Sequence, residues 1–312
     1  MTLPFTLLID PVPADSAQTE FAGTFHEMDS TAPALRVGEL STQRGDGIFE
    51  TLSVVDGHPQ EVEAHINRLR HSAEICDLPA PNAAQWREAI GYAVSRVPQE
   101  GEVALKFVLS RGVESGPAPT AWLHATRAPD HSAARENGVR AITLDRGYPR
   151  GVAEVAPWLL MGAKTLSYAI NMAALREARR RGADDTIFLT HDGSVMEGPT
   201  SSVVLRSNGV YATPAPSGAI LHGTTQQSLF EHLEAEGDAA EYRDITVAEL
   251  RAADAVWLLS SIRLAVAVTE LDGLPLSTDL PATRAFNAYL LGRTDESDNP
   301  PSVNSFDGDF GT

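Results

Sequence analysis

The chain has 312 residues, of which 43% are hydrophobic and 21% charged, a length and composition typical of a globular protein with two ordinary domains. Its 42 acidic and 24 basic residues give a net charge of -18, which argues against nucleic acid and anionic membranes as partners. The single cysteine, Cys76, excludes an internal disulfide, favours a cytoplasmic location and is interpreted as a packed helix residue. We expect no signal peptide, no transmembrane helix and, from nine scattered histidines, no metal site.

The first part of the chain predicts strands, then helices, then a strand. Residues 47–60 alternate apolar and polar side chains around a turn at 56–57, which indicates a β-hairpin. Residues 62–79 and 82–98 carry apolar side chains at helical spacing. Alternate residues of 102–112 are apolar, which indicates a strand with one buried face, made by Val103, Leu105, Phe107 and Leu109.

The second part of the chain resumes with a predicted strand over 139–145 and a helix from about Ser167 to Gly182. Residues 184–205 predict a strand, a turn, a second strand, a loop and a third strand. Residues 223–237 predict a short loop that enters a helix.

These elements predict an α/β fold of two domains, a smaller N-terminal one over 1–128 and a larger C-terminal one over 139–293. The polar, hydrophobe-poor stretch 129–138 is predicted to be the linker between them. Residues 294–312 are acidic and rich in Ser, Pro and Gly, so we expect a disordered tail.

Lysine is almost absent from the chain. Only Lys106 and Lys164 occur, so 22 of the 24 basic residues are arginine. Lys164 ends the apolar run 158–163, where an ammonium group is poorly solvated. Unlike a guanidinium, an amine can lose its proton near neutral pH and attack a carbonyl. The placement therefore predicts a lysine that reacts with an aldehyde, such as that of pyridoxal phosphate.

Pyridoxal phosphate has two further groups to bind, a ring nitrogen and a phosphate. Glu197 lies in an apolar-flanked loop and suits the nitrogen, although a turn glutamate that faces water is an equal alternative. Gly-Thr-Thr at 223–225 suits the phosphate, although Thr224 and Gln227 could form a capping box instead. Arg68, on a predicted helix, either turns inward to the phosphate or forms a surface salt bridge.

The order of these segments carries a specific resemblance. GDGIFET, HINRL, LSRG, a lysine, a glutamate and GTT follow one another as in the class IV aminotransferases, the fold-type IV pyridoxal-phosphate enzymes, and the resemblance covers about Gly45 to Gly273. It implies a fold like that of D-amino acid aminotransferase, with the cofactor at the junction of two α/β domains. It also implies a homodimer in which loops of one subunit close the other subunit's site.

Within that family, the segments GAKTLSYAINMAALREA, EGPTSSVVL, GTTQQSLFE and SSIRLAVAVTELDG look most like the aminodeoxychorismate lyases. This resemblance implies a lyase that converts 4-amino-4-deoxychorismate to 4-aminobenzoate, a folate precursor, and pyruvate. The alternative is a class IV transaminase that acts on branched-chain or D-amino acids.

By resemblance, Lys164 forms the Schiff base with the cofactor and acts as general base, and Glu197 is the partner of the ring nitrogen. Arg111 matches an arginine that can meet a substrate carboxylate. Arg263 is a more speculative second contact, because a surface or domain-bridging role suits it slightly better. Lys106, where the family often has arginine, is interpreted as structural. The cofactor is assigned to Arg68, Lys164, Tyr168, Glu197, Thr200, Ser201, Gly223, Thr224, Thr225 and Ser261, and the substrate to Phe49, Arg111 and Arg263.

Overall fold

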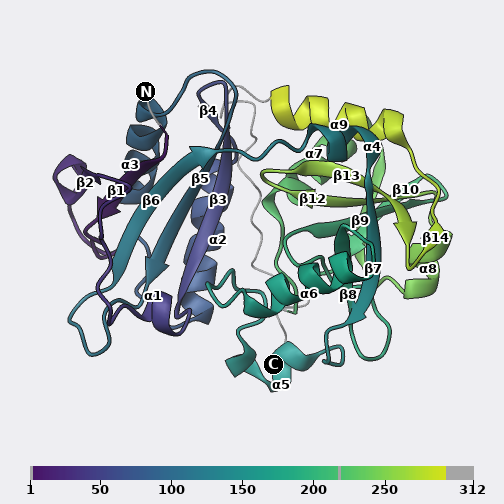
Figure 1. Cartoon of the computed structure of the whole chain (residues 1–312), viewed down its shortest axis with the longest axis horizontal. Coiled ribbons are helices and arrows are strands. Elements are labelled where there is room, and N and C mark those ends of the chain that lie inside the picture. Colours follow the sequence, from purple (N-terminus) through teal and green to yellow (C-terminus); the bar gives the residue numbers. More distant parts are fainter. Residues whose placement is uncertain (1–2, 217–218, 293–312) are drawn as a thin grey trace.

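The structure, a computed structural model, describes residues 3–216 and 219–292. Its strands form two sheets, one in each half of the chain, and the two halves lie side by side as an N-terminal and a C-terminal lobe (Figure 1). The expected α/β fold of two lobes is confirmed. The predicted tail, 294–312, lies outside the described residues.

The N-terminal lobe is an antiparallel sheet with two helices on one face. The strand order is β2-β1-β6-β5-β3-β4. The strands are β1 (Phe5–Ile9), β2 (Phe25–Met28), β3 (Gly47–Val55), β4 (His58–Pro59), β5 (Glu102–Ser110) and β6 (Thr120–Arg127). Helices α2 (Val62–Ile75) and α3 (Ala83–Arg96) cover the core, in which Trp86 and Phe107 are fully buried. A short helix, α1 (Leu40–Gln43), precedes β3.

The structure confirms the predicted elements of this lobe. The hairpin at 47–60 is β3 and β4, and the two predicted helices are α2 and α3. The alternate apolar residues of β5 are all buried, as expected. Cys76 is buried at the end of α2, where burial raises the pKa of its thiol to about 11, as suits a packed residue.

The C-terminal lobe is a mixed sheet covered on both faces. The strand order is β11-β10-β9-β12-β13-β7-β8, with β14 beside β13. The strands are β7 (Val139–Asp145), β8 (Asp185–Leu189), β9 (Ser202–Ser207), β10 (Val210–Pro214), β11 (Ala239–Arg243), β12 (Ala255–Ser260), β13 (Leu264–Leu271) and β14 (Leu274–Pro275). Helices α7 (Thr224–Glu236) and α9 (Leu280–Gly292) cover one face around Trp257, and α8 (Val247–Ala252) lies on the other. Helix α6 (Ala169–Arg180) packs beside β8.

One predicted strand in this lobe is wrong, and the apolar run before Lys164 is more exposed than its composition indicates. The second strand expected within 184–205 is reduced to isolated bridges at Ser194 and Val195. The apolar run before Lys164 is not a buried segment: it contains a 3-10 turn, Pro157–Leu159, after the short helix α5 (Val152–Val155), and the Trp158 side chain is 74% exposed. An apolar run of six residues therefore did not identify a buried segment here.

The stretch predicted as a linker contains helix α4 (Ser132–Asn137), which packs on β13 and α9. Arg135 of α4 binds both lobes. Its Nη1 and Nη2 donate to the carboxylate of Glu102 on β5 at 2.8 and 2.6 Å. Its Nε and Nη2 donate to the carbonyl oxygens of Arg263 and Ile262 at 3.1 and 2.8 Å. The stretch is therefore a cross-link between the lobes as well as a connection in the chain.

Candidate active site

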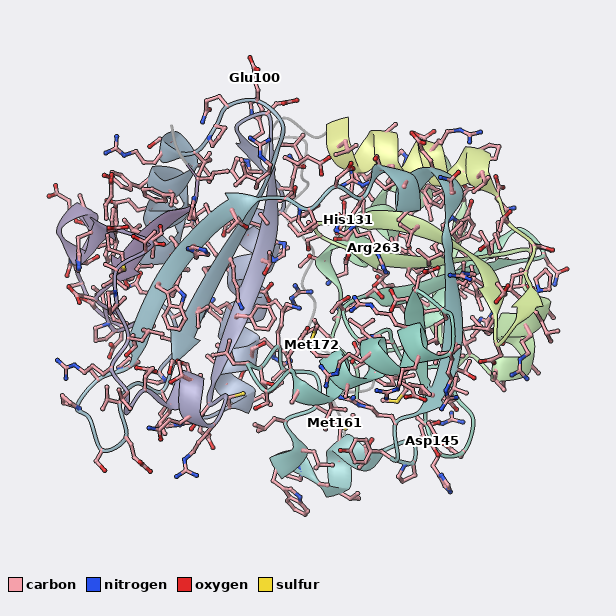
Figure 2. All side chains as sticks on the ribbon, in the orientation of Figure 1. Glu100, His131, Asp145, Met161, Met172 and Arg263 are labelled. Atoms are coloured by element: carbon pink, nitrogen blue, oxygen red, sulfur yellow. The ribbon has the colours of Figure 1, made fainter. Side chains whose placement is uncertain are left out.

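A cavity of about 1260 Å³ lies between the lobes and is lined by residues of both. His131, Arg263 and Met161, which line it, are spread along the boundary in Figure 2. A single small ligand usually occupies a pocket of roughly 300–1,000 Å³, so this cavity has room for a cofactor and a substrate together. The lining includes every residue predicted to bind either one: Phe49, Arg68, Arg111, Lys164, Tyr168, Glu197, Thr200, Ser201, Gly223, Thr224, Thr225, Ser261 and Arg263.

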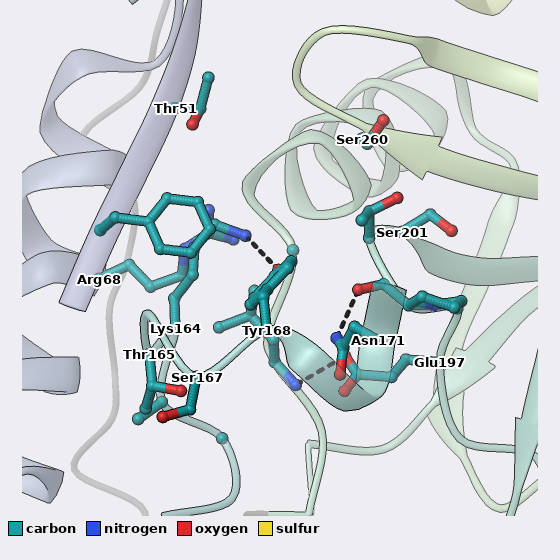
Figure 3. Close-up of a pocket in the computed structure, with 18 of the residues that line it drawn as sticks. Thr51, Arg68, Lys164, Thr165, Ser167, Tyr168, Asn171, Glu197, Ser201 and Ser260 are labelled. Carbon is teal, nitrogen blue, oxygen red and sulfur yellow. Dashed lines mark hydrogen bonds between the residues drawn. The ribbon is translucent and has the colours of Figure 1, made fainter. Parts of the chain in front are cut away.

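Lys164 is held by the N-terminal lobe, although it follows α4 in the sequence. The Phe49 N–H of β3 donates to the Lys164 carbonyl oxygen at 3.0 Å, and the Lys164 N–H donates to Ser72 Oγ of α2 at 3.1 Å. Its Nζ donates to Tyr168 Oη at 3.2 Å and lies 4.8 Å from the ring centre of Phe49. The amine thus stands in the cavity on a backbone that is fixed at both of its polar groups (Figure 3).

Glu197 lies across the cavity from Lys164, on the loop between β8 and β9 (Figure 3). Its Oε2 accepts a hydrogen bond from the Leu221 N–H at 3.0 Å. Burial raises the pKa of this carboxyl to about 7, against the lowering effects of that hydrogen bond and of Arg146. A carboxyl in this setting gains stability from a cationic ligand, and a protonated pyridine nitrogen is such a ligand.

Two residues beside Glu197 were missed in the sequence. Asn171 of α6 donates from Nδ2 to the Pro199 carbonyl oxygen at 2.6 Å and accepts from Nη2 of Arg146 at 3.3 Å (Figure 3). The guanidinium of Arg146 lies 4.4 Å from the ring centre of Phe188. Nothing in the local sequence marks either residue, because their roles come from contacts between segments 25 residues apart.

The N-terminus of α7 faces the cavity without a side-chain cap. Gly223 is its N-cap, and a Cβ there would lie 2.2 Å from Ser202 Oγ, so a larger residue would force the Ser202 side chain to move. The capping box suggested for Thr224 and Gln227 is not formed. The first N–H groups of the helix therefore have no partner within the helix and are available to an anion such as a phosphate.

Arg68 turns inward from α2 and pairs with Glu50 of β3, which is fully buried. Its Nε and Nη2 donate to the two carboxylate oxygens at 2.7 Å each, and Nη1 donates to the His222 carbonyl oxygen at 3.0 Å. A guanidinium has five N–H donors, so two are left for a ligand. The alternative of a surface salt bridge is excluded, since the ion pair is in the interior.

His65 connects Glu50 to the N-terminus of α7. Its Nδ1 lies 2.8 Å from Glu50, and its Nε2 lies 3.4 Å from the hydroxyl oxygens of both Thr224 and Ser261. Burial raises the pKa of Glu50, but Arg68 and His65 outweigh it and hold this pKa at about 2. Glu50 is therefore ionised and fully engaged by the protein itself.

The remaining predicted cofactor contacts lie on two loops. Ser201 Oγ is buried and has no hydrogen-bond partner within residues 3–216 and 219–292. Thr200, beside it, is exposed. Ser261 lies in the turn between β12 and β13, and its hydroxyl lies 3.4 Å from that of Thr225. A buried hydroxyl with no partner at the cavity wall is a further donor for a ligand.

The two arginines predicted to contact substrate line the cavity but already have carboxylate partners. Arg111 Nε donates to Asp46 at 2.8 Å, and its other nitrogens donate to two backbone carbonyl oxygens. Arg263 Nη2 lies 2.6 Å from Oδ2 of the buried Asp185, at an angle outside that of a hydrogen bond. Each cation is therefore partly neutralised within the protein.

These residues fit pyridoxal phosphate: an amine, a carboxyl in need of a cation, an uncapped helix N-terminus and an unpaired hydroxyl surround one cavity. In the described part of the chain, no three His, Cys, Asp or Glu side chains gather as a metal site. The helices described here are all too short or too polar to cross a bilayer.

Comparison with known proteins gives one family. The sequence profile for amino-transferase class IV matches residues 47–271. A Mycobacterium tuberculosis protein named bifunctional aminodeoxychorismate lyase / D-amino acid transaminase is 47% identical over 251 residues, which are 77% of this chain and 87% of the relative. A fold IV transaminase from Curtobacterium pusillum has a TM-score of 0.88 at 47% identity, over 93% of this chain and 100% of the other. A hypothetical aminotransferase from M. tuberculosis, in its PLP-bound form, has a TM-score of 0.84 at 42% identity, over 94% and 99%.

Proposed function

The chain belongs to the class IV aminotransferases, which use pyridoxal phosphate, and we propose that within this family it acts as an aminodeoxychorismate lyase. The proposed reaction converts 4-amino-4-deoxychorismate to 4-aminobenzoate and pyruvate, and it consumes no amino acceptor. The observation that carries this proposal is the 47% identity, over 77% of the chain, to a relative named for that activity.

In this proposal the groups nearest the chemistry are Lys164, Tyr168 and Glu197. When bound, pyridoxal phosphate supplies an aldehyde that captures an amine and a ring that withdraws electrons. Lys164 Nζ would hold the cofactor through its aldehyde, and the same amine is the proposed base for the proton at C4 of the substrate. Tyr168 Oη, 3.2 Å from Nζ, orients that amine. Glu197 would hold a proton on the ring nitrogen, and the positive nitrogen would give its buried carboxylate a direct ionic partner.

The phosphate is proposed to bind at the N-terminus of α7. Thr224 and Thr225 supply backbone N–H groups and hydroxyls there, and Arg68 supplies its two remaining N–H donors. Ser201 and Ser261 supply hydroxyls from the two neighbouring loops. Glu50 and His65 do not touch the cofactor in this proposal; they orient Arg68 and Thr224.

The substrate is proposed to meet Phe49, Arg111 and Arg263, which all line the cavity. Their ion pairs with Asp46 and Asp185 reduce the charge that the two arginines offer. The structure therefore supports a structural role for Arg263, paired with Asp185 within the C-terminal lobe, at least as well as a direct contact, and both arginine contacts stay predictions.

A second candidate function is transamination of D-amino acids. The name of the 47% identical relative includes this activity, which favours D-amino acids over branched-chain amino acids for this chain. The same lysine, glutamate and phosphate site would serve both reactions. The difference lies in the substrate, because a transaminase requires a keto acid to regain its starting form.

We also propose that the chain works as a homodimer in the cytoplasm. Trp158 and Ile170, which line the mouth of the cavity, are 74% and 58% exposed, and Val155 nearby is 74% exposed. Apolar side chains gathered at the edge of a site favour coverage by another protein surface. A second copy of the chain would bury them and close the cavity. Light scattering should give twice the mass of one chain, and a Trp158→Asp variant should shift the mass toward a monomer.

The decisive experiment offers the purified protein aminodeoxychorismate, without any keto acid, and follows 4-aminobenzoate by its fluorescence. We expect steady formation of 4-aminobenzoate and an equal amount of pyruvate. D-Alanine with 2-oxoglutarate, in a parallel assay, measures transamination. Keto-acid exchange without any 4-aminobenzoate would overturn the lyase proposal and favour the second candidate.

The role of Lys164 has its own test, because the chain contains only one other lysine. Borohydride reduction of the cofactor-loaded protein should attach the cofactor mass to Lys164. Mass spectrometry of the digested protein reads the position, with Lys106 as an internal control in the same cavity. A label on Lys106 alone, or none, would contradict the proposed role.

A further inference from the structure

The turn between β12 and β13 has a strained backbone. It consists of residues 261–263, and Leu264, where β13 begins, has a φ of 63°. This is the left-handed region, which glycine adopts freely and a leucine adopts at a cost. The Leu264 side chain is buried in the core of the C-terminal lobe. A turn with such a residue keeps one conformation only where its surroundings hold it.

Arg135 of α4 holds this turn by its carbonyl groups. Its Nε donates to the Arg263 carbonyl oxygen at 3.1 Å, and its Nη2 donates to the Ile262 carbonyl oxygen at 2.8 Å. These two carbonyl groups come directly before Leu264. The pairing of β13 with β7 begins at Val268, farther along the strand. A side chain therefore bonds the turn at the place where its backbone is strained.

The guanidinium of Arg135 is itself fixed in orientation. Glu102 of β5 accepts hydrogen bonds from Nη1 and Nη2 at 2.8 and 2.6 Å. A carboxylate bonded to two nitrogens sets the plane of a guanidinium, which a lysine ammonium cannot reproduce. The Arg135 side chain is also mostly buried. The two bonds to the turn are therefore made from a fixed position.

The turn carries one of the hydroxyls proposed to bind the cofactor phosphate. Ser261, its first residue, lines the cavity, and its hydroxyl lies 3.4 Å from Thr225 Oγ1 and 3.4 Å from His65 Nε2. The turn lies at the boundary of the lobes, where Figure 2 labels Arg263. Contacts in a binding site lose much of their effect when a donor moves by about 0.5 Å. A change in the turn would thus act at the N-terminus of α7.

We propose that Arg135 is a positioning residue for the phosphate end of the cofactor site. It holds the turn 261–263 so that the Ser261 hydroxyl stays beside Thr225, and it acts through the turn without touching the cofactor. The inference rests on the proposed binding of the phosphate at the N-terminus of α7. It is the same for the lyase and for the transaminase, because both reactions use this phosphate site.

The test measures how strongly binding depends on the phosphate. Cofactor-free protein is titrated with pyridoxal phosphate and, separately, with pyridoxal, which has the aldehyde and the ring but no phosphate. Arg135→Met keeps the apolar stem of the side chain and removes its four hydrogen bonds. It should raise the dissociation constant of pyridoxal phosphate at least ~10-fold and that of pyridoxal less than ~3-fold, as expected for a weakened charge-assisted contact.

Arg206→Met is the matched control. Arg206 also forms a mostly buried ion pair, with Asp279, and lies on β9 opposite Ala255, at the end of β12 away from the turn. This variant should lose stability without any change in the preference for pyridoxal phosphate over pyridoxal. If Arg135→Met does not fold, Arg135→Lys takes its place, because lysine keeps the charge beside Glu102 but loses the fork. Its preference for the phosphate should then be lower than that of the unmutated protein.

The phosphorus resonance of the bound cofactor gives a second readout, since its chemical shift depends on the hydrogen bonds to the phosphate. It should move in Arg135→Met and stay in place in Arg206→Met. An unchanged preference and resonance in the Arg135 variant would overturn the inference. So would equal losses of affinity for pyridoxal phosphate and pyridoxal, because a general loss of structure acts on both.

Failure of the proposed phosphate site is a separate result. Arg68→Ala and Ser261→Ala each remove a group that would touch the phosphate itself, and both should lower the preference for pyridoxal phosphate. If neither does, the phosphate binds elsewhere, and the proposed site falls together with the inference. If both do and the Arg135 variant does not, the site stands and only the role of Arg135 is overturned.

Discussion

Glu50, buried behind the N-terminal wall of the cavity, and Glu197, on its C-terminal wall, have opposite electrostatic settings. Glu50, in the N-terminal lobe, is bonded by Arg68 and His65 at 2.7 to 2.8 Å, and its pKa is held at about 2. Glu197, in the C-terminal lobe, accepts one backbone N–H among the described residues, and burial raises its pKa to about 7. The protein neutralises the first carboxylate itself and leaves the second for a ligand.

This difference indicates that the N-terminal side of the cavity has a structural role and the C-terminal side takes part in the reaction. On the N-terminal side, Glu50 is paired with Arg68 before any cofactor binds, and two backbone hydrogen bonds hold Lys164, so both cations have fixed positions. Glu197, on the C-terminal side, is in no ion pair among residues 3–216 and 219–292 and gains a direct partner when a cation binds beside it. Substitutions on the first wall should therefore change stability, and those on the second should change chemistry.

The largest effect is expected from Glu50→Ala. This change leaves Arg68 in the interior without its carboxylate, so the free energy of unfolding should fall by about 3–5 kcal/mol. Urea unfolding of the cofactor-free protein measures it. Glu63→Ala, which removes an exposed ion pair with Arg87, is the matched control and should cost less than about 1 kcal/mol. Equal losses in the two variants would remove the distinction between the walls.

Glu197→Gln should leave folding nearly intact and reduce turnover. The amide cannot stabilise a positive ring nitrogen, and such a preorganised electrostatic contact contributes a few kcal/mol, roughly 100-fold or more in rate. Steady-state assays measure turnover, and the visible absorption of the cofactor shows that it stays bound. Turnover equal to that of the unmutated protein would show that Glu197 does not act on the cofactor ring.

Arg68→Ala should weaken cofactor binding, and it should reduce turnover less than Glu197→Gln does. Loss of the proposed phosphate contact should weaken cofactor binding by about 2 kcal/mol, while kcat of the saturated enzyme changes little. Titration of cofactor-free protein with pyridoxal phosphate gives the dissociation constant. Arg87→Ala, on the surface, is the control. An unchanged dissociation constant would place the phosphate away from Arg68.

The smallest effect is a pH dependence of opposite sign at the two carboxyls. The folded pKa of Glu197, about 7, is above its ordinary value of 4.5, so its contribution to stability is present below pH 4.5 and is lost as pH rises toward 7. The folded pKa of Glu50, about 2, is below 4.5, so its contribution is present above pH 4.5 and is lost as pH falls toward 2.

When the pH rises from about 5 to about 7.5, the free energy of unfolding of the cofactor-free protein should therefore fall. The fall should be at least about 1 kcal/mol larger than in the Glu197→Gln variant. Urea titrations at the two pH values, on both proteins, measure this difference. Parallel pH slopes for the two proteins would contradict the elevated pKa of Glu197.

The sequence predicted the fold well where local patterns decide the structure. The alternation in β5 and the helical spacing in α2 and α3 depend on neighbouring residues alone, and the structure confirms them. It failed where tertiary contacts decide. The apolar run before Lys164 is only partly buried, with Trp158 74% exposed, and the polar stretch with Arg135 is a helix held by Glu102 of the other lobe.

The site shows the same division. Lys164 was marked by its rarity and by its place in an ordered set of motifs, and all of the predicted residues line one cavity. Local sequence could not distinguish Glu197 from a solvent-facing turn, because the burial that raises its pKa comes from distant segments. Asn171 was missed for the same reason, because helix spacing predicts which face of a helix is buried but not which residues lie opposite that face.

Arg135 has a thermodynamic consequence for ligand entry. Its four hydrogen bonds span Glu102 of one lobe and the turn at 262–263 of the other, and the pairing of Lys164 with Phe49 is a second connection between the halves. A hinge motion of the lobes would have to break such bonds together. The width of the cavity is thus set during folding, so a ligand loses little affinity to ordering the protein around it.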